Sequence, residues 1–425
     1  MKSARQTSRG TRIALLSAIL VIFAFDVVPA MSAEKVLHVF QGGTDGLVPQ
    51  GALIADNAGD LYGTTDGGGG GTNCFEGDTY GCGTVYEITA GGTESVLHAF
   101  KGGCDGSDPF GGMVRDKQGN LYGTTATGGI CNSSAGNGTI FKLTPGGTES
   151  VLYAFQGGSD GSVPIGSLIS DKDGNLYGAT QGGGAFSGAD CANVGCGTVF
   201  ELKPDGTRVT LYTFQGGTDG AVPFAGLIAD TNGNLYGTTV EGGNLAECSP
   251  SGCGVVFKVA ADGSESALYT FQGGADGAAP RSTLIADTVG NLYGTVTFGG
   301  NVQSCRPPGG CGAVFKFAPD GTESVLYAFN GGSDGAIPYA GVTMDKSGNL
   351  YGTTYYGGST ACHGNGCGTV FNLAPDGTET VLHAFKRLNK GRMPAASLLL
   401  KSGILYGTAT AGGTSNNGVV FSVRK

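Results

Sequence analysis

The sequence of 425 residues contains no tryptophan, and only four of its residues are histidines. The lack of tryptophan weakens the case for a platform that stacks sugars, although tyrosine can take its place. Basic residues number 24 against 34 acidic ones, and the net charge of −10 argues against nucleic acid as a partner. A helical solenoid is also excluded, because no stretch between the frequent glycines keeps an apolar period of 3.6 residues.

Glycine, by contrast, is abundant at 83 residues, and much of it belongs to a repeated pattern. A Leu-Tyr-Gly triplet occurs seven times, at intervals of 55 to 60 residues. Its tyrosines are Tyr62, Tyr122, Tyr177, Tyr236, Tyr293, Tyr351 and Tyr406. A period of this length indicates repeated supersecondary units that belong to one domain.

Each of the first six units contains four segments with the length and composition of strands. In the unit around Tyr236 they lie at residues 225–230, 235–239, 255–259 and 267–271. The Asp-x-x-Gly-Asn and Asp-Gly sequences between them favour turns, because asparagine and glycine tolerate positive φ. The sequence therefore predicts an all-β fold, a seven-bladed β-propeller of four-stranded antiparallel blades. We expect the blades at about residues 50–101, 110–156, 165–215, 224–272, 281–330, 339–386 and 395–425.

The seventh unit ends without its fourth strand. The missing segment stands near the other terminus, where Val-Leu-His-Val-Phe at residues 36–40 resembles Val-Leu-His-Ala-Phe at residues 381–385. We therefore expect residues 35–40 to complete the last blade, which removes a sheet edge that would otherwise favour aggregation.

The first 33 residues read as a signal peptide. Lys2, Arg5, Arg9 and Arg12 precede an apolar run at residues 13–25, with small residues suited to cleavage after residue 30 or 33. The run is shorter than a membrane span requires, residues 34–425 contain no later candidate span, and the chain ends without an anchor sequence. We expect a secreted or periplasmic monomer that is one propeller domain over residues 34–425.

Twelve cysteines support export. Ten form close pairs between the second and third strands of their units, and the remaining two lie in loops on the same face. The expected disulfides are Cys74–Cys82, Cys104–Cys131, Cys191–Cys196, Cys248–Cys253, Cys305–Cys311 and Cys362–Cys367. Such usage is typical of an oxidising compartment. Zinc is disfavoured at these pairs, because it needs four convergent ligands and only one pair has a nearby histidine, His363.

The full pattern of the unit is Leu-Ile-Ala-Asp, Gly-Asn-Leu-Tyr-Gly-Thr-Thr, Gly-Gly, Cys-Gly-Thr-Val-Phe and Asp-Gly-Thr-Glu. It resembles the GloVer tandem-repeat proteins, exported bacterial proteins described as "choice-of-anchor". It is more distantly similar to the two-component-regulator and NHL propeller repeats. The resemblance implies an exported repeat protein of no established activity, and it supplies no catalytic residues.

An aspartate recurs in six of the seven loops that enter a blade. The set is Asp45, Asp105, Asp160, Asp219, Asp276 and Asp334. We interpret these residues first as turn carboxylates that accept backbone N–H groups. The alternative is that they bind Ca²⁺, which prefers carboxylate and carbonyl oxygens. No other cofactor or metal is expected.

A specific binding site must break the seven-fold repeat, and two departures do so. The residue after the recurrent proline varies, and we expect it at the mouth of the central channel: Gln50, Phe110, Ile165, Phe224, Arg281, Tyr339 and Ala395. The seventh connection replaces the acidic loop with basic residues, Lys386, Arg387, Lys390 and Arg392. These basic residues either balance the charges of Asp334 and Asp45 or bind an anionic ligand.

The leading hypothesis is a non-catalytic module that binds an extracellular or envelope protein or glycan. Alternatives are a hydrolase or lyase acting on extracellular polymers, by analogy of fold alone, and a structural surface repeat protein. His38, His98 and His383 share one fourth-strand position that is tyrosine in other units, so we interpret them as strand substitutions. An enzyme predicts carboxylates with a His or Tyr in the channel, whereas a binding module predicts aromatic and charged groups near Phe224, Arg281 and Tyr339.

Overall fold

The computed structural model of the protein describes Met1 and residues 34–72, 74, 80–131, 136–185, 191, 194–302, 305, 309–386 and 389–425. The chain divides into two units, Met1–Met31 and Ser32–Lys425, and the fold below is that of the second. Apart from Met1, the expected signal peptide lies outside the described residues, and so does Arg387. Over the described residues, no helix is long and apolar enough to cross a membrane.

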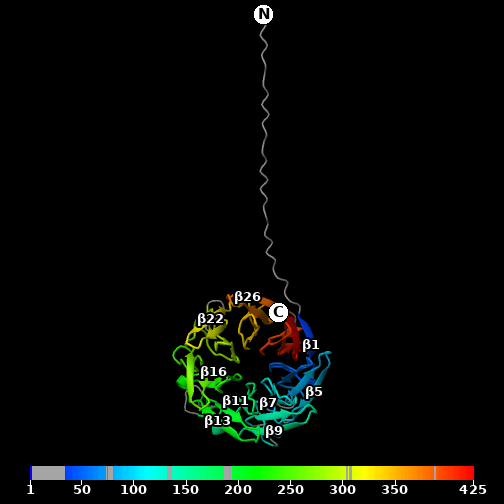
Figure 1. Cartoon of the computed structure of the whole chain (residues 1–425). Coiled ribbons are helices and arrows are strands. Elements are labelled where there is room, and N and C mark those ends of the chain that lie inside the picture. Colours follow the sequence, from blue (N-terminus) through cyan, green and yellow to red (C-terminus); the bar gives the residue numbers. More distant parts are fainter. Residues whose placement is uncertain are drawn as a thin grey trace. The chain divides into compact units, whose positions relative to one another are not determined.

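Seven antiparallel sheets surround a central axis in this unit (Figure 1). Blade one contains β2 (Ile54–Ala55), β3 (Leu61–Thr65), β4 (Thr84–Ile88) and β5 (Glu94–Ala99). Blade two contains β6 (Val114–Arg115), β7 (Leu121–Thr125), β8 (Thr139–Leu143) and β9 (Glu149–Ala154). Blade three contains β10 (Ile169–Ser170), β11 (Leu176–Thr180), β12 (Thr198–Leu202) and β13 (Arg208–Thr213).

The next three blades repeat this order of strands. Blade four contains β15 (Ile228–Ala229), β16 (Leu235–Glu241), β17 (Val255–Val259) and β18 (Glu265–Thr270), with β14 (Ala221–Pro223) also paired to β16. Blade five contains β19 (Ile285–Ala286), β20 (Leu292–Val296), β21 (Ala313–Phe317) and β22 (Glu323–Ala328). Blade six contains β23 (Thr343–Met344), β24 (Leu350–Thr354), β25 (Thr369–Leu373) and β26 (Glu379–Ala384).

The seventh blade joins the two ends of the chain. Its strands are β28 (Leu399–Lys401), β29 (Ile404–Ala409), β31 (Val419–Arg424) and β1 (Lys35–Val39), in the order β1-β31-β29-β28. The strand β1 pairs antiparallel with β31, so that Val36 lies opposite Phe421 and Val39 opposite Val419. Figure 1 shows the blue β1 beside the red C-terminal strands. The seven-bladed fold and its closure by the N-terminal strand are confirmed.

The Leu-Tyr-Gly triplet has a distinct task for each residue, as blade four shows. Leu235 is buried, and the Tyr236 hydroxyl donates a hydrogen bond to Asp230, 3.1 Å away. Gly237 leaves room for the Phe257 ring of the next strand, whose Cζ would lie 2.6 Å from a Cβ at this position. The leucine and the glycine of the triplet are therefore required by packing between strands. The tyrosine stabilises the hairpin turn that begins at Asp230.

Neighbouring blades are joined by pairs of buried aromatic rings. The phenylalanine after each fourth strand meets an aromatic residue of the next blade's third strand, edge to face, at centroid distances of 5.0 to 5.3 Å. The pairs are Phe40–Tyr86, Phe100–Phe141, Phe155–Phe200, Phe214–Phe257, Phe271–Phe315, Phe329–Phe371 and Phe385–Phe421. Each such pair contributes about 0.5–1.5 kcal/mol beyond the burial of its area.

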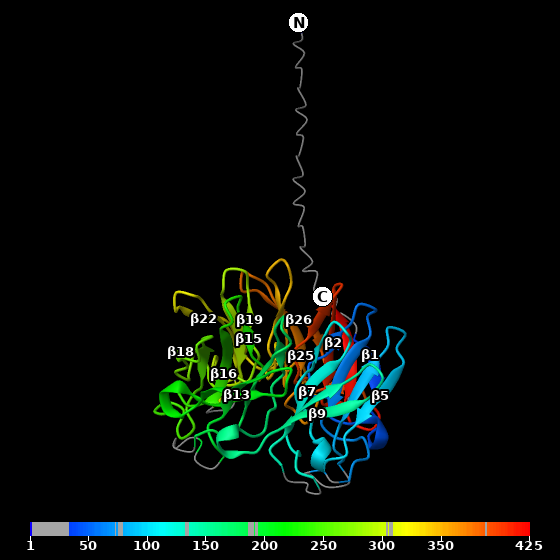
Figure 2. The ribbon, with the colours of Figure 1, turned by 60° about the horizontal axis from the view of Figure 1, so that its bottom comes forward.

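The connections between blades lie on one face of the ring. Four of them contain 3₁₀ turns, η1 (Gly43–Asp45), η2 (Gly103–Asp105), η3 (Gly158–Asp160) and η4 (Gly217–Asp219), seen along the lower rim of Figure 2. The short strands β27 (Gly391–Arg392) and β30 (Ala411–Gly412) pair in the corresponding region of blade seven. The disulfide loops share this face, because Cys104 of one connection is bonded to Cys131.

Candidate functional site

The residues after the recurrent prolines line the mouth of the central channel. Gln50, Phe110, Phe224, Arg281 and Tyr339 surround one cavity of about 450 Å³. The remaining lining residues are Val48, Phe298, Ile337, Tyr355, Tyr356, Ala395 and Thr410. Beneath it lies a narrower space of about 90 Å³ that residues of all seven blades line, Ile165 among them.

The channel is narrow at this level because backbones of neighbouring blades approach closely. A Cβ at Gly166 would lie 2.6 Å from the carbonyl oxygen of Ala225, so only glycine fits here. The Gly226 N–H donates to the Thr283 hydroxyl of the next blade at 3.1 Å. In this narrow layer the backbones of neighbouring blades are therefore in direct contact.

Arg281 is the charged centre of the mouth. Its guanidinium carbon lies 5.0 Å from the ring centroid of Phe224 and 5.3 Å from that of Tyr339, within the range of cation–π attraction. The Arg281 Nε is buried and donates no hydrogen bond within the described part of the chain. A planar cation is thus held between two aromatic faces with donor capacity left over.

Further aromatic rings extend this wall in both directions. Phe110 meets Phe224 edge to face with 5.9 Å between centroids. On the other side, the ring centroid of Tyr339 lies 5.3 Å from that of Tyr355. The ring centroids of Tyr355 and Tyr356 are 4.9 Å apart. Burial raises the pKa of the Tyr355 hydroxyl, so this group stays protonated at neutral pH. The mouth therefore offers flat apolar faces beside one cation.

The backbone that presents these side chains adopts an unusual conformation. The residue before each recurrent proline has positive φ, between 53° and 60°: Val48, Asp108, Val163, Val222, Ala279, Ile337 and Met393. For most residues this conformation costs about 1–2 kcal/mol. Hydrogen bonds hold it: Ile337 donates its N–H to the Cys311 carbonyl at 2.8 Å and accepts the Tyr355 N–H at 2.9 Å. The disulfide loop of blade five is therefore linked to the tyrosine wall of blade six through the residue that precedes the recurrent proline.

The polar side chains that line this cavity are those of Gln50, Arg281, Tyr339, Tyr355, Tyr356 and Thr410. Among the described residues that line it there is no histidine and no carboxylate. A carboxylate lies next to the lining, because Gln50 Nε2 donates to Asp66 Oδ2 at 3.3 Å. The arrangement can bind and orient a ligand through stacking and one positive charge.

The described basic residues of the seventh connection, Lys386, Lys390 and Arg392, do not line this cavity. Lys386 is exposed, Lys390 Nζ lies 3.6 Å from Glu34 Oε2, and Arg392 donates two hydrogen bonds to Asn416 Oδ1 at 3.1 and 2.8 Å. Asp45 and Asp334, whose charges this loop was expected to balance, form hydrogen bonds elsewhere. Asp45 is bonded to His38, and Asp334 accepts the Tyr327 hydroxyl. Charge balance is thus supplied by Glu34, immediately before β1.

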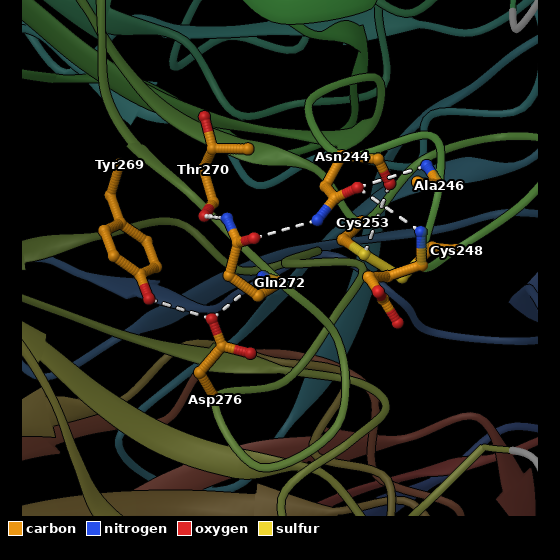
Figure 3. The surroundings of a disulfide bond; sticks show 9 residues. Asn244, Ala246, Cys248, Cys253, Tyr269, Thr270, Gln272 and Asp276 are labelled. Atoms are coloured by element: carbon orange, nitrogen blue, oxygen red, sulfur yellow. Dashed lines mark hydrogen bonds between the residues drawn. A yellow bond between two sulfur atoms is a disulfide. The ribbon is translucent and has the colours of Figure 1, made fainter.

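The loop aspartates accept backbone hydrogen bonds, as the turn interpretation expects. Each accepts the N–H of the residue four positions earlier at 2.6 to 2.9 Å. In blade four, Asp276 also accepts the Tyr269 hydroxyl at 2.8 Å, and Figure 3 shows Tyr269 and Gln272 meeting at this carboxylate. The same loop is attached to the Cys248–Cys253 region, because Asn244 Nδ2 donates to Gln272 Oε1 at 2.8 Å.

Glutamates that the sequence reasoning missed lie against these aspartates. They start the fourth strand of the following blade: Glu94, Glu149, Glu265, Glu323 and Glu379, with Glu34 in the equivalent position before β1. Burial, and next the charge of Asp219, raise the pKa of Glu265 to about 7. The signal in the sequence is the glutamate of Asp-Gly-Thr-Glu, which recurs at one place in the unit and was interpreted only as part of a turn.

All twelve cysteines are paired in the six disulfides expected from their spacing. Five of these bonds close loops of five to eight residues between the second and third strands, and the sixth joins Cys104 to Cys131. This density of disulfides fits an exported protein.

Comparisons with known proteins agree with the fold. The family model of the Gloeobacter/Verrucomicrobia repeat matches residues 70–306 and 249–425. Virginiamycin B lyase from Staphylococcus aureus is similar in structure, with a TM-score of 0.57 and 11% identity over 92% of this chain and 99% of that chain. The extracellular domain of a hybrid two-component system from B. thetaiotaomicron has a TM-score of 0.56 and 10% identity, over 92% of this chain and 39% of that one. No curated protein matches the sequence.

Proposed function

The chain belongs to the Gloeobacter/Verrucomicrobia repeat family, and from this premise we propose that it is an exported, non-catalytic propeller that binds an extracellular ligand at its channel mouth. Six disulfides support export. The similarity to an extracellular domain of a two-component system is compatible with this location.

The observation that carries the proposal is the position of Arg281 between Phe224 and Tyr339 in a cavity at the channel mouth. Stacking on aromatic faces suits the flat side of a sugar ring, and the guanidinium suits a carboxylate. The ligand class that fits best is an acidic oligosaccharide, such as a chain that contains uronic acid residues. The tyrosines supply the stacking surface that tryptophan would give elsewhere.

The two alternative functions have weaker support. The name of one structural neighbour suggests a lyase or hydrolase. At 11% sequence identity, however, this similarity supports only the same fold and not the same activity. The described lining of the cavity offers neither a histidine nor a carboxylate for acid–base chemistry. A purely structural repeat would spread its variable residues evenly, whereas here six of seven variable positions meet at one cavity.

The test is a binding screen of the mature protein against neutral and uronate-containing oligosaccharides, followed by calorimetry on those that bind. We expect Arg281→Ala to weaken the binding of an acidic oligosaccharide at least tenfold, and Tyr339→Phe to change it far less than Tyr339→Ala. Arg424→Ala is the matched control, because this exposed arginine lies at the end of β31 and does not line the cavity. Failure of every acidic oligosaccharide to bind, or equal binding by Arg281→Ala, would refute the proposal.

A further inference from the structure

Two of the blade junctions bring together a histidine, an aspartate and a glutamate. The first is His38, Asp45 and Glu94, and the second is His98, Asp105 and Glu149. In each, one ligand atom per residue lies within 4.8 Å of the others. Four other junctions have Tyr153, Tyr212, Tyr269 or Tyr327 in place of the histidine, and the last has His383 beside Glu34. Only the first two are among the groups that combine a histidine, an aspartate and a glutamate within the described residues.

The spacing of these atoms suits a tetrahedral metal ion. His38 Nε2 lies 3.1 Å from Asp45 Oδ1, and His98 Nε2 lies 3.3 Å from Asp105 Oδ1. Two ligands bound to one Zn²⁺ ion at about 2.0 Å stand roughly 3.3 Å apart. One imidazole with two carboxylates leaves a fourth position for water, as in open zinc sites.

In each cluster, one glutamate oxygen lacks a hydrogen bond from the described part of the chain. Glu94 Oε1 and Glu149 Oε1 are buried and form no hydrogen bond with any described residue, as is also the case for Glu265, Glu323 and Glu379 at junctions with tyrosine. Buried polar atoms of this kind normally have a partner. At the two clusters the imidazole places a nitrogen ligand beside this free oxygen and the aspartate.

At two other blade junctions, a positively charged side chain of the protein lies beside the carboxylate. Arg208 occupies the position of the glutamate in blade three, with Nη1 3.2 Å from Asp160 Oδ1 and a side chain that is 5% exposed. Beside His383, Lys390 Nζ lies 3.6 Å from Glu34 Oε2. A positive charge at this place is therefore compatible with the fold.

We propose that the two His-Asp-Glu clusters bind divalent transition-metal ions of the Zn²⁺ type, one ion in each. In the first cluster the ligands come from β1 (His38), from η1 (Asp45) and from the start of β5 (Glu94). An ion there ties the N-terminal strand to blade one across the seam of the ring. Because the unfolded chain does not hold these ligands together, binding stabilises the closed propeller.

The experiment measures zinc bound to the EDTA-treated mature protein by equilibrium dialysis and calorimetry, and Tm with and without Zn²⁺. We expect two ions per chain, one in His98→Tyr or His38→Tyr, and none in the double variant. Tyrosine is the residue of the corresponding positions Tyr153, Tyr212, Tyr269 and Tyr327, so these variants should fold with an unchanged metal-free Tm.

His363→Ala is the control, because this histidine lies outside both clusters and should leave the stoichiometry at two. No binding by the wild type, or undiminished binding by the double variant, would overturn the proposal. Replacement of Glu149 by arginine, which imitates the Arg208 junction, should likewise remove the second ion. Retention of both ions in Glu149→Arg would count against that cluster.

Discussion

The residues Glu265, Glu323 and Glu379 each face a loop aspartate of the preceding blade. Burial, followed by the charges of Asp219, Asp276 and Asp334 respectively, raises their pKa values to about 7. A carboxyl group with such a pKa carries a proton over part of the neutral range, which relieves repulsion within the pair. The blade junctions therefore respond to pH where ordinary surface carboxylates do not.

This arrangement predicts how stability depends on pH. The folded-state pKa of about 7 lies above the ordinary value of 4.5, so the folded chain binds these protons more tightly than the unfolded chain. Their stabilising contribution is complete below pH 4.5 and is lost as the pH rises through about 7. We expect Tm, measured in EDTA, to fall between pH 5 and pH 8.

The variant Glu265→Gln/Glu323→Gln should show a shallower fall over the same range, because amides do not titrate. Glu247→Gln is the matched control, since this exposed glutamate lies beside Cys248 and not at a blade junction. An identical slope in the double variant and the wild type would contradict this assignment.

Some of the residues that line the channel mouth could be predicted from the sequence. Variation after each proline identified Phe224, Arg281 and Tyr339, because a repeat makes every departure visible. Tyr355 and Tyr356 were missed, although they interrupt the pattern at the end of their strand in the same way. The glutamates of the junctions were missed because their aspartate partners lie about 45 residues earlier, across a blade boundary.

At the scale of the elements, the strand β1 closes the ring by pairing with the last strand of the chain. It is held by pairing with β31 in the last blade and by Phe40, whose fully buried ring meets Tyr86 of blade one at 5.1 Å. The equivalent phenylalanines of other blades are part of a continuous hairpin, whereas β1 is joined to its sheet by no hairpin. Its side chains must therefore supply the attachment.

The variant Phe40→Ala tests this attachment. Removal of a buried phenylalanine ring typically destabilises by about 3–5 kcal/mol, and we expect a loss of that size with a lower urea midpoint. Lys35→Ala, at an exposed position of the same strand, should change stability by less than about 0.5 kcal/mol. A midpoint for Phe40→Ala close to that of the wild type would show that β1 contributes little.

The blade itself was predictable as an element because its determinants are local. Leu-Tyr-Gly, the Asp-x-x-Gly-Asn turn and the fourth-strand pattern lie within one unit, and each agrees with the same hairpins. The short first strands, such as Ile228–Ala229, and the extra pairing of Ala221–Pro223 with β16 are less visible in the sequence. They depend on how each connection crosses the channel mouth.

At the scale of the whole molecule, the proposed binding site depends on closure of the ring of blades. The cavity at the mouth is lined by residues from Val48 to Thr410, which come together only if the first and last blades meet. The number of units and the missing fourth strand predicted this closure. The composition of the cavity could not be predicted in the same way, because it depends on contacts between residues hundreds of positions apart.

Amide hydrogen exchange of the mature protein tests the closed ring most directly. We expect the β1 amides, read from peptides that cover residues 35–39, to be protected to the same degree as those of β31, which they pair with. Exchange of β1 at the rate of an unstructured chain, while the other six fourth strands stay protected, would contradict the closed propeller and the channel-mouth site with it.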